Sequence, residues 1–144
     1  MKKLVLLLVP AALLLFAFGT TDPIAREHQI QPQELNYLII NPNITEKPVI
    51  INIGTTDDMI KGAIKAGPCN DAKGMEAFKA KMAGIAKDKD IIVYCGCCSS
   101  ANCPNIHPAL DYLMQNGYTK AKVLNLMVGI KENWVTMNFP MDKK

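Results

Sequence analysis

The chain has 144 residues, a formal net charge of +3 at pH 7, five cysteines and a single arginine, Arg26. Its length is enough for one domain with a buried core. Its charges form no basic cluster interleaved with aromatic residues, which excludes nucleic acid as an expected partner.

The amino terminus has the pattern of a secretory signal. Met1-Lys2-Lys3 is a short basic start, residues 4–18 are apolar, and Ala17-Phe18-Gly19 offers small residues at the spacing that a signal peptidase reads. The apolar run is shorter than the roughly 18–20 residues that span a bilayer. We therefore expect residues 1–19 to be cleaved and the protein to be exported, to a bacterial periplasm or to the exterior, with no membrane contact afterwards. An uncleaved anchor is the alternative.

The mature chain begins with a polar lead-in over residues 20–29 and continues as one domain over residues 30–144. Helical spacing of apolar residues is found over residues 30–40, 55–65, 74–86, 106–114 and 130–135. Apolar runs rich in β-branched residues predict strands over residues 48–53, 91–94 and 123–126. This alternation predicts an α/β fold with a central, mainly parallel sheet and helices on both faces.

Four of the five cysteines fall in one loop after the strand predicted over residues 91–94. The loop reads Cys95-Gly96-Cys97-Cys98-Ser99-Ser100-Ala101-Asn102-Cys103, and a helical pattern resumes after it. A thiol between a strand end and a helix N-terminus lies where backbone N–H groups and the helix dipole stabilise an anion. Because the thiolate is the reactive form of cysteine, Cys95 is the candidate nucleophile. The candidate anion cradle consists of Gly96, Cys97, Cys98, Ser99 and Ser100.

Several short motifs, in order along residues 30–140, resemble the rhodanese-like domain family. Residues 91–95, Ile-Ile-Val-Tyr-Cys, resemble the family's strand and cysteine, and residues 62–67 resemble its Gly-His-Ile-x-Gly-Ala signature without the histidine. Gly117-Tyr118 is similar to the end of the helix that follows the cysteine. The closing motif of the family resembles Leu126, Gly129, Trp134 and Pro140, with Asn138 in place of a late glycine.

This resemblance implies a doubly wound α/β domain that acts as a sulfurtransferase without a cofactor. Cys95 would attack a sulfane donor, hold the sulfur as a persulfide within the cradle, and pass it to an acceptor. The implied partners are small sulfur donors and acceptors or a thiol protein. Active members of the family usually carry a cation near the cysteine, and this loop has no arginine.

Two other functions fit the same loop. Cys95 and Cys98 form a C-x-x-C pair at a strand-to-helix junction, which is typical of thiol–disulfide redox proteins. A metal-binding module is the other alternative, since thiolates and imidazole bind Cu(I) or Zn(II), although the spacing matches no common zinc pattern. The ligands would then be Cys95, Cys97, Cys98, Cys103 and His107.

An odd number of cysteines in an exported protein predicts disulfides and one remaining thiol. Cys103 could bridge to Cys97 or Cys98. Cys69, which the rhodanese resemblance places near the loop, could take another partner. Two disulfides would leave Cys95 free.

Overall fold

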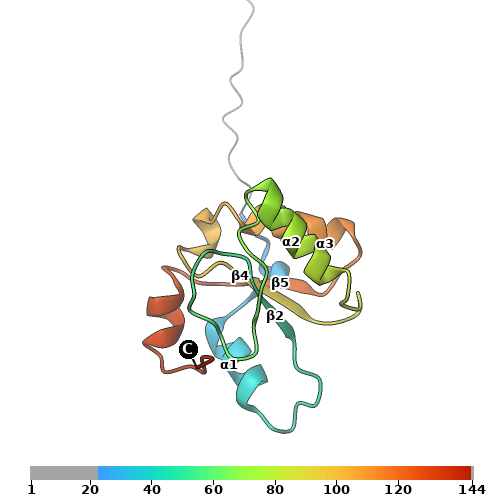
Figure 1. Ribbon diagram of the computed structural model, residues 1–144. Helices are drawn as coiled ribbons and strands as arrows, with labels where there is room; N and C mark the ends of the chain where they lie inside the picture. The colour runs from blue at the N-terminus through green and yellow to red at the C-terminus, as the bar shows by residue number, and fades with distance from the viewer. Residues whose placement is uncertain (1–22, 144) are drawn as a thin grey trace, which may run out of the picture.

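At the centre of the computed structural model, which describes residues 23–143, lies a five-stranded parallel sheet (Figure 1). Its strand order is β1-β5-β4-β2-β3. The strands are β1 (Gln29–Ile30), β2 (Val49–Asn52), β3 (Ile64–Lys65), β4 (Ile91–Tyr94) and β5 (Ala121–Leu124). Strand β4 occupies the middle, where Val93 pairs with Ile51 of β2 and with Val123 of β5. All residues of β4 are buried, as expected for a parallel strand covered on both faces.

One face of the sheet is covered by α2 (Ala72–Met82) and α3 (Ile106–Gln115), which lie side by side in Figure 1. Phe78 of α2 and Leu113 of α3 share an apolar cluster with Val93 and the other strand residues that point to this side. Both helices are amphipathic, because their buried residues recur at three- and four-residue intervals.

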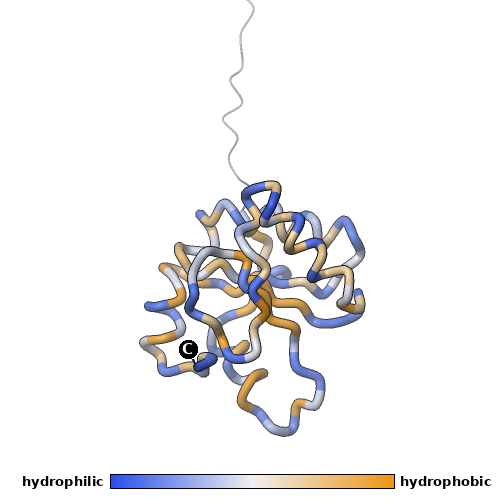
Figure 2. Tube along the Cα trace, viewed as in Figure 1, coloured by the Kyte–Doolittle hydropathy of each residue, from blue (hydrophilic) through white to orange (hydrophobic). Residues whose placement is uncertain are grey.

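The opposite face is covered by α1 (Pro32–Ile40) and by a single π-helical turn, η3 (Lys131–Val135). Leu35 and Trp134, neither accessible to solvent, pack with Ile92 and the strand residues that point this way. The strands between the two layers form the most apolar part of the chain trace (Figure 2). The expected α/β fold, with a parallel sheet and helices on both faces, is confirmed.

The lead-in takes part in the fold, which the sequence did not indicate. It forms the short 3-10 turn η1 (Arg26–His28) and then β1, so the expectation that a helix begins at residue 30 is wrong. Ile30 pairs with Leu124 of β5 and is only 2% exposed. A strand of two residues carries no periodicity, and it is the free edge of β5 that holds it in place.

The helix expected over residues 55–65 is also wrong. This segment is an extended connection that ends in β3, where Ile64 pairs with Ile51 of β2. Ile60 is fully buried because it bridges to Met141 near the end of the described chain and because its N–H donates to the Tyr94 hydroxyl. The helical spacing was produced by contacts that are remote in sequence.

Within the described residues, no helix is long and apolar enough to cross a bilayer. The predicted signal over residues 1–19 and the first residues of the lead-in lie outside the described part of the chain.

Candidate functional site

The four cysteines of the loop after β4 converge on one point. The Sγ atoms of Cys95, Cys97, Cys98 and Cys103 all lie within 4.8 Å of one another. The Sγ atom of Cys97 is 3.1 Å from that of Cys95 and 3.4 Å from that of Cys98. All five cysteines of the chain are free thiols in the structure, so none of the expected disulfides is present among residues 23–143.

The cluster reaches from the core to the surface. Cys95 and Cys103 are each only 2% exposed and belong to the apolar cluster under α2 and α3. Cys98 is half-buried and Cys97 is exposed. A reagent therefore meets Cys97 first, and the buried thiols are reached from that side.

Two glycines allow the chain to pack tightly around Cys95. A Cβ atom at Gly54, after β2, would lie 2.1 Å from the Cys95 carbonyl oxygen and 2.8 Å from its Sγ atom. Gly96 adopts a φ of +83° and its Cβ would lie 2.7 Å from the Thr56 side chain. Gly54 is required by the close approach alone, whereas Gly96 combines a close approach with a left-handed backbone that glycine adopts readily.

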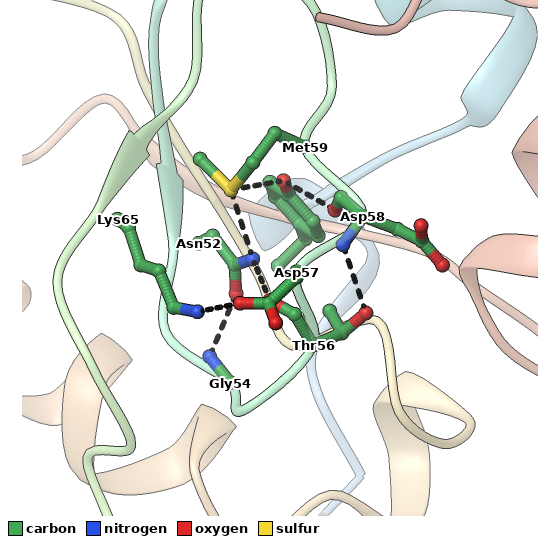
Figure 3. Close-up of polar contacts among 8 residues, drawn as sticks. Asn52, Gly54, Thr56, Asp57, Asp58, Met59 and Lys65 are labelled. Carbon is green, nitrogen blue, oxygen red and sulfur yellow. Dashed lines mark hydrogen bonds and ion pairs between the residues drawn. The ribbon is translucent and has the colours of Figure 1, made fainter. Parts of the chain in front are cut away.

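A buried asparagine fixes the connection that carries Gly54 (Figure 3). Asn52, the last residue of β2, is inaccessible to solvent. Its Oδ1 accepts a hydrogen bond from the Gly54 N–H at 2.9 Å, and its Nδ2 donates to the Thr56 carbonyl at 3.1 Å. Asn52 Nδ2 also lies 3.4 Å from the Met59 sulfur. The strand end therefore determines where Gly54 meets the site.

A second buried asparagine, Asn105, contacts the sulfurs directly. It occupies the N-cap of α3, yet its side chain makes no cap hydrogen bond. Its Oδ1 accepts from the Asn70 N–H at 2.9 Å, which orients Nδ2 toward Cys95 Sγ at 3.3 Å and Cys103 Sγ at 3.8 Å. Asn105 is thus a donor to sulfur rather than a helix cap.

Three thiols of the cluster, those of Cys95, Cys97 and Cys98, have raised pKa values, which favours their protonated form. The pKa of Cys95 is raised well above its ordinary value, first by the hydrogen bond with Cys103 and then by burial, which together outweigh the hydrogen bonds from Cys97 and Asn105. Burial, followed by the hydrogen bond with Cys97, raises the pKa of Cys98 to about 11. No lysine, arginine or histidine is among the groups that act most strongly on Cys95. The expected stabilisation of a thiolate at the strand end is outweighed by the hydrogen bond with Cys103 and by desolvation.

The other predicted residues have different surroundings. The Ser100 N–H donates to the Leu126 carbonyl and its hydroxyl to the Leu124 carbonyl, so Ser100 joins the loop to the end of β5. The Ser99 hydroxyl accepts from the Asn102 side chain. His107 lies on α3 outside the group of converging ligand atoms.

Cys69 is buried, with its Sγ atom 3.9 Å from the Gly67 carbonyl oxygen, and it also lies outside the group. Sequence reasoning identified the four converging cysteines and missed Asn52, Gly54 and Asn105. The available signals were a glycine directly after the β-branched run over residues 48–53 and an asparagine just before a predicted helix.

No family model, curated protein or solved structure matches the chain.

Proposed function

We propose that this domain is a rhodanese-like sulfurtransferase that carries sulfane sulfur on Cys95. In the loading step a persulfide donor R–S–SH and the Cys95 thiol give Cys95–S–SH and R–SH. In the discharge step a thiol acceptor A–SH takes the terminal sulfur, giving A–S–SH and the free Cys95 thiol. Neither step needs an oxidant or a reductant, and neither needs a cofactor.

The contact between Cys95 and Cys97 carries this proposal. Cys95 is buried at the carboxyl end of the central strand, and Cys97, whose Sγ atom is 3.1 Å away, is exposed. In parallel α/β sheets, ligands bind at the carboxyl ends of the strands. A sulfur atom held on Cys95 is therefore within reach of a thiol that a partner can contact.

Local geometry at the end of the chain supports the resemblance on which the proposal draws. Asn138, which stands where the family has a glycine, adopts a left-handed φ of 55° that asparagine tolerates better than most residues. The Trp134 indole N–H donates to the Pro140 carbonyl at 3.1 Å and so closes this segment.

The surroundings of Cys95 favour a donor of low charge. Arg26 lies in η1 before β1, and the side chains that act most strongly on the pKa of Cys95 are those of other cysteines and Asn105. A thiosulfate dianion would have to be desolvated beside these thiols without a compensating cation. We therefore propose hydropersulfides, rather than thiosulfate, as donors.

Thiol–disulfide exchange is the second candidate, and the same contact favours it. A persulfide on Cys95 can be resolved by the neighbouring thiol, so that Cys95–S–SH and Cys97–SH give a Cys95–Cys97 disulfide and hydrogen sulfide. The 3.1 Å contact between these two sulfurs makes Cys97, rather than Cys98, the resolving thiol.

The test is sulfur transfer from a low-molecular-weight hydropersulfide to a thiol acceptor, measured for the wild-type protein and for Cys95→Ala, Cys97→Ala and Cys69→Ala. We expect Cys95→Ala to abolish transfer and Cys69→Ala to retain it. Peptide mapping of the loaded wild-type protein should find a mass increase of about 32 Da on Cys95. Transfer by Cys95→Ala at the wild-type rate would contradict the proposal. Loss of disulfide formation in Cys97→Ala, with transfer retained, would separate the two candidates.

A further inference from the structure

The four converging sulfurs have the number and spacing of a metal site. A four-coordinate thiolate site with metal–sulfur bonds of about 2.3 Å places its sulfurs about 3.8 Å apart. The sulfurs of Cys95, Cys97, Cys98 and Cys103 all lie within 4.8 Å of one another, with contacts of 3.1 Å and 3.4 Å at Cys97. Shifts of less than about 1 Å in side-chain position would bring them to tetrahedral spacing.

The scaffold also provides what a thiolate site requires outside its ligands. Asn105 Nδ2 approaches the sulfurs of Cys95 and Cys103, and its amide is oriented by the hydrogen bond from Asn70. Such N–H donors orient metal ligands and reduce the charge on them. The exposed Cys97 and half-buried Cys98 leave an entry path from solvent, while the two buried cysteines anchor the site in the core.

The electrostatic setting favours a cation from outside the protein. Four sulfurs meet at the edge of an apolar core, and the groups that act on Cys95 most strongly include no basic side chain. As thiols these sulfurs are neutral, but the thiolates of the two buried residues, Cys95 and Cys103, would be negative charges in the core that no basic side chain neutralises. A soft metal ion supplies that partner charge while it displaces the protons.

We infer that Cys95, Cys97, Cys98 and Cys103 form a thiolate site for one soft d10 metal ion, four-coordinate Zn(II) or Cu(I). Binding releases one proton from each thiol that becomes a ligand and involves no redox change. This function goes beyond sulfur transfer. Because a bound ion occupies the Cys95 sulfur, the metal-bound protein is inactive in transfer.

Cobalt(II) provides the first test on the full-length reduced protein under anaerobic conditions. One equivalent of Co(II) should produce the sulfur-to-cobalt charge-transfer band and the visible d–d bands of tetrahedral thiolate coordination. Zn(II) should then displace the cobalt at a ratio of one ion to one chain. Absence of these bands, or saturation at one ion per two chains, would overturn the inference.

Alanine variants assign the ligands. Cys97→Ala and Cys103→Ala should each weaken Zn(II) affinity by about 100-fold or more, because loss of an outer-shell partner alone typically costs about 10- to 100-fold. Competition with a chromophoric chelator measures the affinity. Cys69→Ala, the matched loss of a buried cysteine outside the group, should bind as the wild type does. Wild-type affinity in both ligand variants, or equal weakening in Cys69→Ala, would overturn the assignment.

Two further measurements make the result independent of folding and of the metal chosen. The exposed Cys97 allows a ligand to be removed without touching the core, so Cys97→Ala decides the matter if Cys103→Ala fails to fold. Alkylation of Cys97 in the wild-type protein should slow at least about tenfold when one equivalent of Zn(II) or Cu(I) is present, because coordination takes up the thiolate that reacts. Unchanged alkylation with both ions would contradict the proposed site.

Discussion

At the scale of single residues, the absence of a side chain at Gly54 is what allows the β2 connection to reach the sulfurs. Any Cβ atom there would overlap the Cys95 carbonyl oxygen and crowd its Sγ atom. The neighbouring atoms are backbone and a buried thiol, so neither can move aside easily. The position is therefore restricted by packing, although its backbone conformation is open to other residues.

We expect Gly54→Ala to destabilise the fold by about 1–3 kcal/mol, the usual cost of forcing extra atoms into a packed core. Gly84→Ala is the matched control, because the nearest atom to a Cβ at Gly84 is 4.0 Å away. Urea unfolding of both variants measures the difference. Equal stability of the two variants would show that the close approach to Cys95 is relaxed in solution.

At the scale of elements, the end of β2 organises the connection to β3 through one side chain. Asn52 satisfies the buried Gly54 N–H and the partly buried Thr56 carbonyl (Figure 3). A backbone hydrogen-bonding group that loses its partner while buried costs about 1–3 kcal/mol. The whole connection, including its contact with Cys95, therefore depends on this amide.

Asn52→Ala should lower the free energy of unfolding by about 1–3 kcal/mol. Asn43→Ala, at an exposed position in the loop before β2, should change it by no more than about 0.5 kcal/mol. Denaturant unfolding at neutral pH compares the two. If Asn52→Ala unfolds at the same denaturant concentration as Asn43→Ala, the hydrogen bonds of Asn52 contribute nothing net.

The elements differ in how far sequence could predict them. Strand β4 was predicted over its full length because all its residues are apolar and a charged turn precedes it. Ile60 misled the prediction, since its burial comes from Met141 and the Tyr94 hydroxyl rather than from a helix face. Strand β1 was missed because only the pairing of Ile30 with Leu124 defines it. Local patterns predict elements that supply their own partners, and long-range pairing decides the rest.

At the scale of the whole molecule, the parallel sheet explains why the site could be predicted in outline. Parallel strands bring their carboxyl ends to one edge, so the connections after β2 and β4 meet there. The grouping of the loop cysteines followed from their closeness in sequence. The exclusion of Cys69 and His107 from the group of converging sulfurs could not be predicted from sequence, because it depends on how α2 and α3 pack on the sheet. The raised pKa of Cys95 could not be predicted either, because it depends first on the hydrogen bond with Cys103 and then on burial under those helices.

Stability at alkaline pH is a property of the whole molecule to which Cys69 contributes. Burial, with smaller contributions from Cys95 and Asp71, raises the pKa of Cys69 from its ordinary 9.0 to about 12. Below pH 9 this thiol is protonated in both the folded and the unfolded chain. As the pH rises from 9 toward 12, the unfolded chain loses the proton first, so the folded state loses stability.

The wild-type protein should therefore lose roughly 1 kcal/mol of stability relative to Cys69→Ala between about pH 7 and about pH 10. Urea unfolding of both proteins at the two pH values, with reductant and chelator present, measures this loss. A difference between the two proteins that stays constant with pH would mean that Cys69 ionises as freely in the folded state as in the unfolded chain.

The position of Asn105 between Asn70 and the sulfurs has a consequence for the helix layer. One side-chain amide donates to the Cys95 sulfur and accepts from the backbone of the segment that leads into α2. A sulfur that becomes negatively charged attracts the amide more strongly than a neutral thiol does. Asn105 therefore joins the loop after β4 to a segment that lies before α2 and contributes no sulfur to the group.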